Sequence, residues 1–208
     1  RWRKKFMPYY HDIITDQSWQ ELIQLNKLIP FVLIGGWATY LYTKTLKSKD
    51  IDIAIDYPAL SALKDAYDVH KNDRLRKYEA VKGPVAIDIY LPHYSTLGMP
   101  VEQIMKQSRL LDGFSVVDPD LLFALKMITL NDRGRSPKGR KDFLDLLALA
   151  QTGICTYEAI VQLLSSSHQN TVVASFRAFL DETTQVPELN ITTHQYAKLK
   201  KILLNSFG

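Results

Sequence analysis

Cysteine is almost absent from this sequence. Cys155 is its single cysteine in 208 residues, so an internal disulfide and a zinc site built from several thiolates are both excluded. The five histidines show no pair at the spacing of a zinc finger or of a helical metal site, and we therefore expect no zinc-centred chemistry. Sparse cysteine is also typical of a reducing compartment, which favours a cytoplasmic location.

Long hydrophobic runs and a general excess of one charge are missing as well. The longest uncharged apolar stretch, residues 28–42, contains Pro30 and two glycines and is shorter than the roughly 18 residues of a membrane span. The formal net charge of +4 comes from the cations among residues 1–5, so the rest of the chain is balanced and does not by itself indicate nucleic-acid binding. With 46% apolar and 23% charged residues, the composition is that of an ordinary globular protein.

Up to about residue 117, short β-branched runs alternate with helical patterns. Ser18 and Glu21 have the spacing of a capping box, which predicts the start of a helix, and Pro58 suits the first turn of another. The expected helices are residues 18–28, 37–46 and 58–69, and the expected strands are residues 31–34, 50–55, 74–80 and 85–91, with residues 110–117 as a further strand or an irregular crossover.

After residue 117 the pattern is helical almost throughout. Asp118 followed by Pro119 is a strong helix start. A loop at residues 133–139 precedes a helix at residues 140–151, which Gly153 ends, and later helices are expected to begin near residues 156, 170 and 192. We therefore predict an α/β (α+β) fold, with a small mixed-sheet core at residues 1–117 and a helical C-terminal domain at residues 118–208.

Glycines and acidic residues follow one another in an informative order. An apolar strand ends in Gly35 and Gly36, a helix-length gap follows, and Asp50 and Asp52 open the next strand. Residues two apart on a strand point to the same face, so these two carboxylates are expected side by side. Asp88 lies at the centre of another apolar strand, which is an unusual place for an acid.

Asp50, Asp52 and Asp88 are therefore the candidate catalytic and metal-binding residues, provided that Asp88 lies beside the first pair. Three neighbouring carboxylates repel one another unless cations lie among them. Mg²⁺ prefers such oxygen ligands together with substrate phosphates, and two ions about 4 Å apart stabilise the attacking and leaving oxygens of a nucleotidyl transfer. Gly35 and Gly36 lack a Cβ, which lets backbone amides approach a phosphate closely.

This arrangement resembles the polymerase-beta-like nucleotidyltransferase superfamily, whose pattern is an apolar strand, Gly-Gly or Gly-Ser, a helix, an Asp-x-Asp pair and a third acid on a following strand. The matching segments are residues 33–38, 47–53 and 87–89. The resemblance implies an NTP substrate, Mg²⁺ as cofactor, and transfer of a nucleoside monophosphate to an acceptor with release of pyrophosphate. Ser48, within the second segment, joins Gly35 and Gly36 as a nucleotide-binding candidate.

A second block resembles the helical half of the AbiEii-like branch, which includes minimal nucleotidyltransferase toxins. The matching residues are 119–126, Arg133 and 141–147. This resemblance implies that Lys126 binds the triphosphate and that Asp142 or Asp145 orients neighbouring side chains or assists catalysis. It also implies a tRNA 3′ end as acceptor and an antitoxin protein as partner, although Gly36 departs from the Ser common in the toxin group.

Each candidate also has a purely structural alternative. Asp50 fits a strand-start cap, Asp52 an exposed strand position, and Asp88 an ion pair with a neighbouring base such as Arg76. Lys126 fits a side chain whose ammonium group reaches solvent from an apolar helix.

The acids and bases near residue 140 admit two interpretations. Asp142 and Asp145 are spaced for local pairs with Lys138 or Lys141. The loop before them is either a phosphate-binding or RNA-binding surface or simply solvated, and its cations are Arg133, Arg135, Lys138, Arg140 and Lys141. Small-molecule and protein hydroxyls stay open as acceptors, and a catalytically silent nucleotide-binding or RNA-binding regulator stays open as a different class of function.

Overall fold

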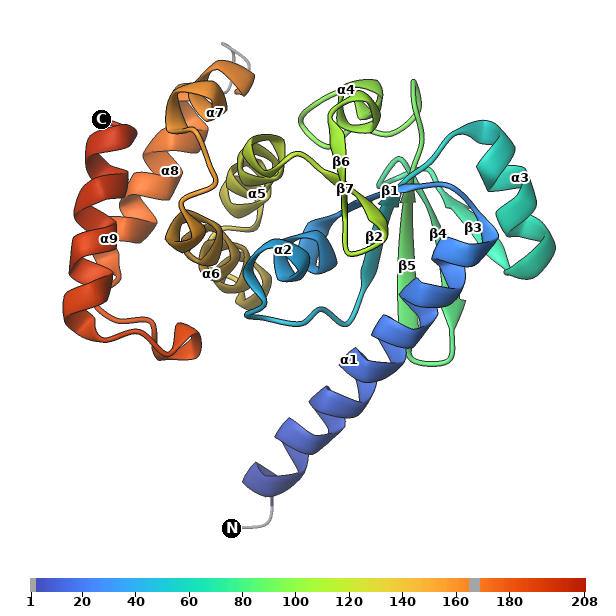
Figure 1. Ribbon diagram of the computed structural model, residues 1–208, viewed down its shortest axis with the longest axis horizontal. Coiled ribbons are helices and arrows are strands. Elements are labelled where there is room, and N and C mark those ends of the chain that lie inside the picture. Colours follow the sequence, from blue (N-terminus) through green and yellow to red (C-terminus); the bar gives the residue numbers. More distant parts are fainter. Residues whose placement is uncertain (1–2, 165–168) are drawn as a thin grey trace. The chain divides into compact units, whose positions relative to one another are not determined.

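The computed structural model describes residues 3–164 and 169–208, which group into two compact units (Figure 1). The sheet unit comprises the chain up to Leu41 together with Lys47–Val117, and the helical unit comprises Tyr42–Leu46 together with Asp118–Gly208. The two units together have the mixed α/β architecture with a helical C-terminal half that the sequence predicts. The division into domains at residue 117 stays a prediction, because the short segment Tyr42–Leu46 groups with the helices.

In the described part of the sheet unit, one seven-stranded sheet has the order β3-β4-β5-β2-β1-β7-β6. Its strands are β1 (Val32–Ile34), β2 (Ile51–Ala54), β3 (Val69–Asn72), β4 (Lys77–Lys82), β5 (Val85–Tyr90), β6 (Ser108–Leu111) and β7 (Phe114–Val117). β2 pairs in parallel with β5 and antiparallel with β1, and β1 pairs in parallel with β7. The strands predicted at residues 31–34, 50–55 and 85–91 are confirmed by β1, β2 and β5.

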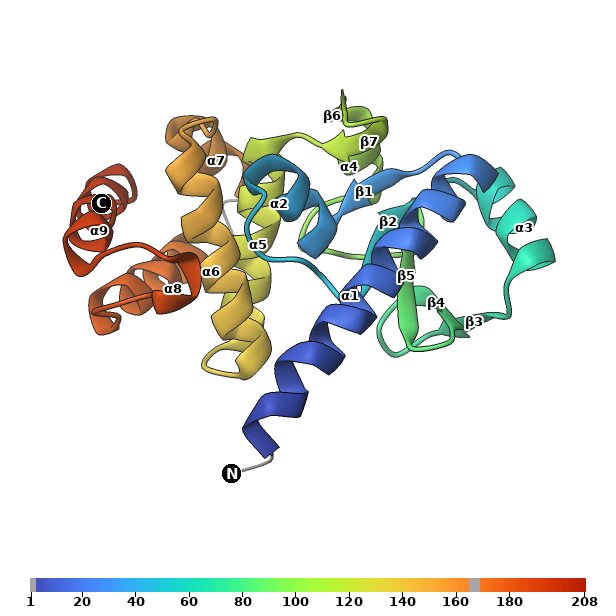
Figure 2. The same cartoon turned by 60° about the horizontal axis from the view of Figure 1, so that its bottom comes forward.

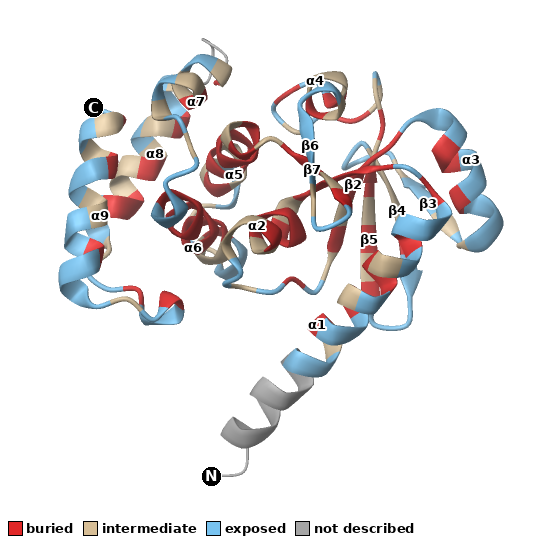
Figure 3. Ribbon diagram, viewed as in Figure 1, coloured by how far each residue is buried: buried red, intermediate tan, exposed pale blue. Residues whose placement is uncertain are grey.

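Alternation along the central strands explains why they are strands. Ile51, Ile53, Ile87 and Ile89 are fully buried on one face of the sheet, while the residues between them are mostly half-buried on the other. Burying these β-branched side chains against the rest of the unit is the main stabilisation of the sheet. Figure 3 shows the resulting buried centre of β2 and β5. The opposite face is therefore free to carry polar groups.

Four helices flank this sheet in the described part of the chain. They are α1 (Arg3–Leu28), α2 (Gly35–Thr43), α3 (Tyr57–Ala66) and α4 (Val101–Lys106). α1 contacts β5, and both views show it running across that strand (Figures 1 and 2). α2 follows β1 directly, so the first turn of the helix lies at the end of the strand.

The predicted start of the first helix at Ser18 is wrong, because α1 already begins at Arg3. The Ser18 hydroxyl does not cap a helix; it is buried and accepts a hydrogen bond from the Trp37 indole Nε1 at 2.8 Å. Glu21, the other half of the expected capping box, instead accepts hydrogen bonds from the Tyr67 hydroxyl and from Lys82 Nζ. Side chains from distant segments thus form the hydrogen bonds that the local pattern assigns to a helix cap.

Several other predicted boundaries in the sheet unit also differ from the structure. α3 ends at Ala66, and Val69 begins β3 rather than ending a helix. β4 begins at Lys77, because Arg76 adopts a left-handed φ of 49° in the turn that joins β3 to β4. Residues 110–117 belong to a hairpin of two strands, β6 and β7.

The helical unit contains α5 (Pro119–Arg133), α6 (Pro137–Thr152), α7 (Tyr157–Leu163), α8 (Gln169–Glu182), the 3₁₀ turn η1 (Pro187–Leu189) and α9 (Thr193–Ser206). The predicted caps are confirmed: the Asp118 side chain accepts from the Asp120 N–H, Gly153 ends α6 in the left-handed conformation, and Thr192 forms a capping box. The loop expected at residues 133–139 is shorter than predicted. The Ser136 side chain caps α6, so this helix begins at Pro137 and not at residue 140.

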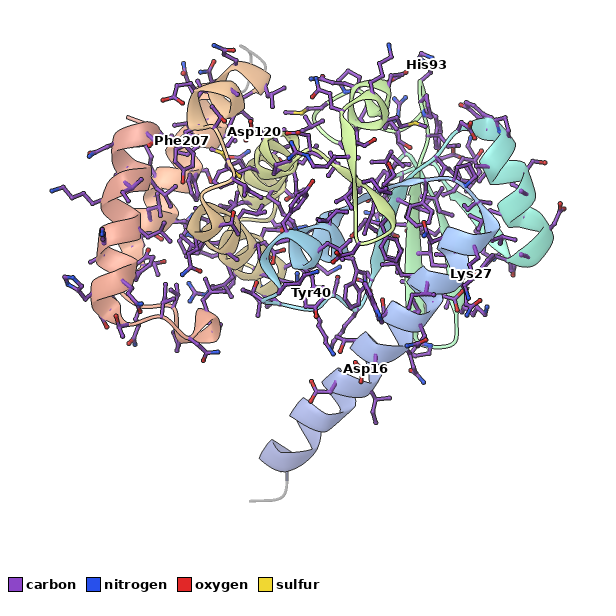
Figure 4. The ribbon with its side chains drawn as sticks, viewed as in Figure 1. Asp16, Lys27, Tyr40, His93, Asp120 and Phe207 are labelled. Atoms are coloured by element: carbon purple, nitrogen blue, oxygen red, sulfur yellow. The ribbon has the colours of Figure 1, made fainter. Side chains whose placement is uncertain are left out.

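An aromatic core holds these helices together. Phe123 on α5 packs against Phe176 on α8 and against Phe207, with ring centroids 5.9 Å apart in both pairs, and Phe207 is labelled in Figure 4. α5 and α6 are the most buried helices of the unit (Figure 3). No helix in residues 3–164 and 169–208 combines the length and apolarity that crossing a membrane requires.

Candidate active site

Gly35 lies where β1 ends and α2 begins. Its φ of +66° is a conformation that side chains disfavour, and a Cβ placed on it would overlap Asp52 Oδ2 and lie 2.7 Å from Asp52 Cγ. The absence of a side chain therefore lets the Asp52 carboxyl group pack directly against the backbone at the N-terminus of α2. The partial positive charge of that helix end stabilises a carboxylate or a phosphate.

Asp52 and Asp88 are neighbours across two parallel strands. The register pairs Asp52 on β2 with Asp88 on β5 and pairs Ile34 at the end of β1 with Asp52. Paired residues on adjacent strands point to the same face, and adjacent strands lie about 4.8 Å apart. The sheet thus presents Asp52 and Asp88 on one face next to Gly35, whereas the sequence predicts Asp50 and Asp52 side by side and sets the approach of Asp88 as a condition.

Asp50 occupies a different position. It lies in a bend before β2, which begins at Ile51, and it is half-buried. Among the residues that the structure describes, no group of three or more His, Cys, Asp or Glu side chains is close enough to hold a metal ion. The structure therefore brings Asp52 and Asp88 together as a pair and does not gather Asp50 with them, and the metal-binding role of the three residues stays a prediction.

Lys77 on β4 provides a positive charge next to the pair. Its Nζ lies 2.7 Å from Asp88 Oδ2 and 2.9 Å from Glu79 Oε1, and its side chain is only 12% exposed. Asn72 Nδ2 on β3 donates to the other Glu79 oxygen at 3.1 Å. An ion pair is therefore present at Asp88, as in the structural alternative, but its base is Lys77. Arg76 instead donates to the Tyr94 carbonyl oxygen at 2.8 Å.

The contacts among Lys77, Glu79 and Asp88 shift the pKa values of Lys77 and Glu79. Burial by itself would lower the pKa of Lys77, but hydrogen bonds to Asp88 and Glu79 outweigh it and raise that pKa. The hydrogen bonds from Lys77 and Asn72 hold the pKa of Glu79 below its ordinary value. Lys77 is therefore a cation and Glu79 an anion at neutral pH.

Sequence analysis missed Lys77, Glu79 and Asn72. Their strands were either unassigned or misplaced, and ordinary polar residues near a turn carry no distinctive motif. The usable signal is the spacing of Lys77 and Glu79, which puts both on one face of β4. Only the pairing of Glu79 with Asp88 in the structure shows that this face of β4 adjoins Asp88 on β5.

The remaining nucleotide-binding candidates of the sheet unit, Gly36 and Ser48, are both buried. Gly36 is buried in the first turn of α2. Ser48 is buried in the irregular segment between α2 and β2. Their nucleotide-binding roles stay predictions.

In the helical unit, Lys126 is buried in an ion network. Lys126 on α5 is 7% exposed, and its Nζ lies 2.9 Å from Asp142 Oδ1 and 2.8 Å from Asp145 Oδ2 on α6. Burial by itself would lower the pKa of Lys126, but the charges of Asp145 and Asp142 outweigh it and raise that pKa. The ammonium group is engaged inside this unit and does not reach solvent as the structural alternative supposes.

The basic loop is largely neutralised by acids of the same unit. Arg133 pairs with Asp142 at 2.7 Å and Lys141 with Asp145 at 3.0 Å. Arg135 pairs with Glu182, and Arg140 with Glu188 at 3.1 Å. Four of the five loop cations therefore have carboxylate partners, which lowers their availability for phosphate.

The residues present fit a divalent cation. Mg²⁺ is held in proteins by one or two carboxylates together with substrate phosphates, and Asp52 and Asp88 supply two carboxylates on one face of the sheet. The N-terminus of α2 at Gly35 lies beside this pair and favours a negatively charged group such as a phosphate.

The close approach at Gly35 predicts a measurable clash. Gly35→Ala should lower the free energy of unfolding by about 1–3 kcal/mol more than Gly153→Ala, because only the former adds a Cβ that overlaps a neighbour. Gly153 is a matched control, with a φ of +69° and no atom within 4 Å of its ideal Cβ. Urea denaturation of both variants measures the difference.

Removing the Asp52 side chain provides a further control for this clash. In an Asp52→Gly background, Gly35→Ala and Gly153→Ala should lower the free energy of unfolding by the same amount, since the overlapping carboxyl group is gone. Equal costs already in the wild-type background would contradict the packing of Asp52 on Gly35.

Comparison with solved structures identifies proteins of the same fold. The chain is similar to JHP933 from Helicobacter pylori, with a TM-score of 0.52 and 15% identity over 93% of this chain and 91% of that one. It is also similar to a candidate nucleotidyltransferase from H. pylori, with a TM-score of 0.51 and 16% identity over 93% and 92% of the two chains. A third similar structure is the antibiotic-resistance factor ANT(2″)-Ia, with a TM-score of 0.50 and 14% identity over 80% and 95%.

The sequence matches no protein-family model and no curated protein. At 14–16% identity the likeness concerns the fold. Structures that share this fold include a candidate nucleotidyltransferase, and membership of the AbiEii-like branch stays a prediction.

Proposed function

We propose that this protein is a metal-dependent nucleotidyltransferase. In the reaction, an acceptor hydroxyl oxygen forms a bond to the α-phosphorus of an NTP. The bond from that phosphorus to the bridging oxygen breaks, and pyrophosphate leaves with the bonding electron pair. The acceptor hydroxyl gives up its proton, and the products are a nucleotidylated acceptor and pyrophosphate.

One observation carries this proposal: the carboxylates of Asp52 and Asp88 lie in register beside Gly35 at the start of α2. The arrangement combines a pair of oxygen ligands with a helix N-terminus, two features that favour the binding of a metal–triphosphate. The shared fold with nucleotidyltransferase-like proteins supports the same conclusion.

Each residue of the site has a role in this proposal. Asp52 and Asp88 hold the divalent ion, and the ion when bound neutralises charge on the phosphates. Asp50 is proposed as a third ligand, which requires it to move toward this pair, because the structure does not gather it with them. Gly35 and Gly36 present backbone amides to the triphosphate. Asp88, whose side chain is 23% exposed, accepts the proton of the acceptor hydroxyl.

Lys126 and Ser48 are proposed to contribute to triphosphate binding. For Lys126 this requires its ammonium group to exchange Asp142 or Asp145 for phosphate, because both acids hold it in this structure. Asp142 and Asp145 are proposed to orient that group.

The acceptor is the open part of the proposal. The branch resemblance favours a tRNA 3′ end, with an antitoxin as protein partner, but the paired loop cations lend this no support. An antibiotic-resistance factor of the same fold makes a small-molecule hydroxyl the natural comparison, and a protein hydroxyl is the third class.

Label transfer tests the proposed function directly. The protein, incubated with Mg²⁺ and each of the four NTPs labelled at the α-phosphate, should attach label covalently to at least one acceptor among bulk tRNA, hydroxyl-bearing antibiotics and protein. Pyrophosphate should appear in equal amount, which distinguishes nucleotidyl transfer from NTP hydrolysis.

A catalytically silent nucleotide sensor is the second candidate, and the ion pair of Lys77 with Asp88 favours it because this pair occupies a metal-binding carboxylate. Tight NTP binding without incorporation into any acceptor would support the sensor and refute the transferase.

A further inference from the structure

Lys77 is held in a position that has no role in the proposed reaction. Its Nζ is shared between Asp88 and Glu79, at 2.7 Å and 2.9 Å. Glu79 is itself fixed by Asn72, and its register partner on β5 is Asp88. A nearly buried ammonium group thus lies on one of the two carboxylates that would hold the metal.

Asp88 and Glu79 share one cation, because the ammonium group of Lys77 contacts both carboxylates. A divalent ion bound by Asp52 and Asp88 would supply positive charge to Asp88 and would leave Lys77 to pair with Glu79 alone. The exchange needs only a small movement, because the ammonium group already contacts Glu79.

We propose that Lys77 is a resident counter-cation that competes with the divalent ion for Asp88 and moves onto Glu79 when the ion binds. This inference rests on the proposed function and adds a regulation to it: Lys77 sets the metal concentration at which the site loads. Lys77 and Glu79 are positioning residues, since both act through Asp88.

Metal binding without nucleotide tests this competition. Mn²⁺ is titrated into the metal-free full chain, and free Mn²⁺ is measured by electron paramagnetic resonance. Lys77→Met should bind Mn²⁺ roughly tenfold more tightly than wild type, because the competing charge is gone. Glu79→Gln should bind it several-fold more weakly, because Lys77 is left with Asp88 as its remaining anionic partner.

Two further variants locate the effect. The double variant Lys77→Met/Glu79→Gln should bind as tightly as Lys77→Met, since Glu79 acts through Lys77. Adding Asp52→Asn to Lys77→Met should abolish the gain in Mn²⁺ affinity. Lys71→Met is the matched control, because Lys71 is exposed, pairs with Asp73 at 2.6 Å and lies on the opposite face of the hairpin; its affinity should equal that of wild type.

An unchanged or weaker affinity in Lys77→Met overturns the inference, as does an absence of Mn²⁺ binding in all variants. If Lys77→Met does not fold, Glu79→Gln decides by itself, and unchanged or tighter binding there overturns the inference. A merely structural role would weaken binding in both variants. The proposed transferase function fails on a different readout, the absence of label transfer by wild type.

Discussion

Asp52→Asn should reduce label transfer from NTP to acceptor by about 10²–10³-fold, the loss typical of removing one preorganised electrostatic group from an active site. Asn has nearly the same shape, so it still fits against the backbone of Gly35. It lacks the negative charge with which Asp52 and Asp88 together hold a divalent ion. Initial rates at saturating NTP and Mg²⁺ measure the effect.

Stability distinguishes this loss from simple damage to the fold. The free energy of unfolding of Asp52→Asn should stay within about 1 kcal/mol of that of wild type, because the lost repulsion from Asp88 offsets the lost attraction to the N-terminus of α2. Asp65→Asn, at an exposed position on α3, is the matched control and should keep full activity. Undiminished transfer by Asp52→Asn would contradict the proposed site.

Lys126→Met should lower the free energy of unfolding by about 3–5 kcal/mol, the cost typical of removing one member of a buried ion pair. Lys126 is the cation that both Asp142 and Asp145 contact, and both acids are almost fully buried. Met has a similar length, so lost packing contributes little. Urea denaturation near pH 7 measures the change.

Lys141→Met is the control for this network. Lys141 contacts the same Asp145, but its side chain is 38% exposed, so its loss should cost less than about 1 kcal/mol. The triple variant Lys126→Met/Asp142→Asn/Asp145→Asn should regain much of the stability. Equal costs at Lys126 and Lys141 would refute the buried network.

The wild-type network should in turn persist at alkaline pH. The folded-state pKa of Lys126 is raised above its ordinary value of 10.5. A cation with a raised folded pKa contributes its full stabilisation below the unfolded pKa and loses it only as the pH rises through the folded one. Lys126 therefore keeps its charge and its ion pairs as the pH rises through its ordinary pKa of 10.5.

Local chemistry in the sequence was sufficient for many elements. The alternation of Ile51 and Ile53 with polar residues predicts a strand with one buried face, and the structure buries both. Asp118 and Thr192 predict helix starts, and both cap helices. Such signals are reliable because a cap or an alternating pattern acts within a few residues.

Signals that depend on distant partners were misread. Ser18 and Glu21 have the spacing of a capping box, but both lie inside a longer helix. Their side chains accept hydrogen bonds from Trp37 and Tyr67 instead. The predicted strand at residues 74–80 began too early, because Arg76 lies in the turn before β4. A local pattern does not reveal which far segment satisfies a polar group.

The sequence by itself determined the fold class and the segments that carry Gly35, Asp52 and Asp88, because glycine, paired acids and apolar alternation are readable within single strands. Only the tertiary structure decided that Asp52 faces Asp88 across two parallel strands, that Lys77 rather than Arg76 pairs with Asp88, and that Lys126 is buried between two acids. The physical reason is register: a shift of one residue would turn each of these side chains to the opposite face, and register depends on how the whole sheet and the helix pairs pack.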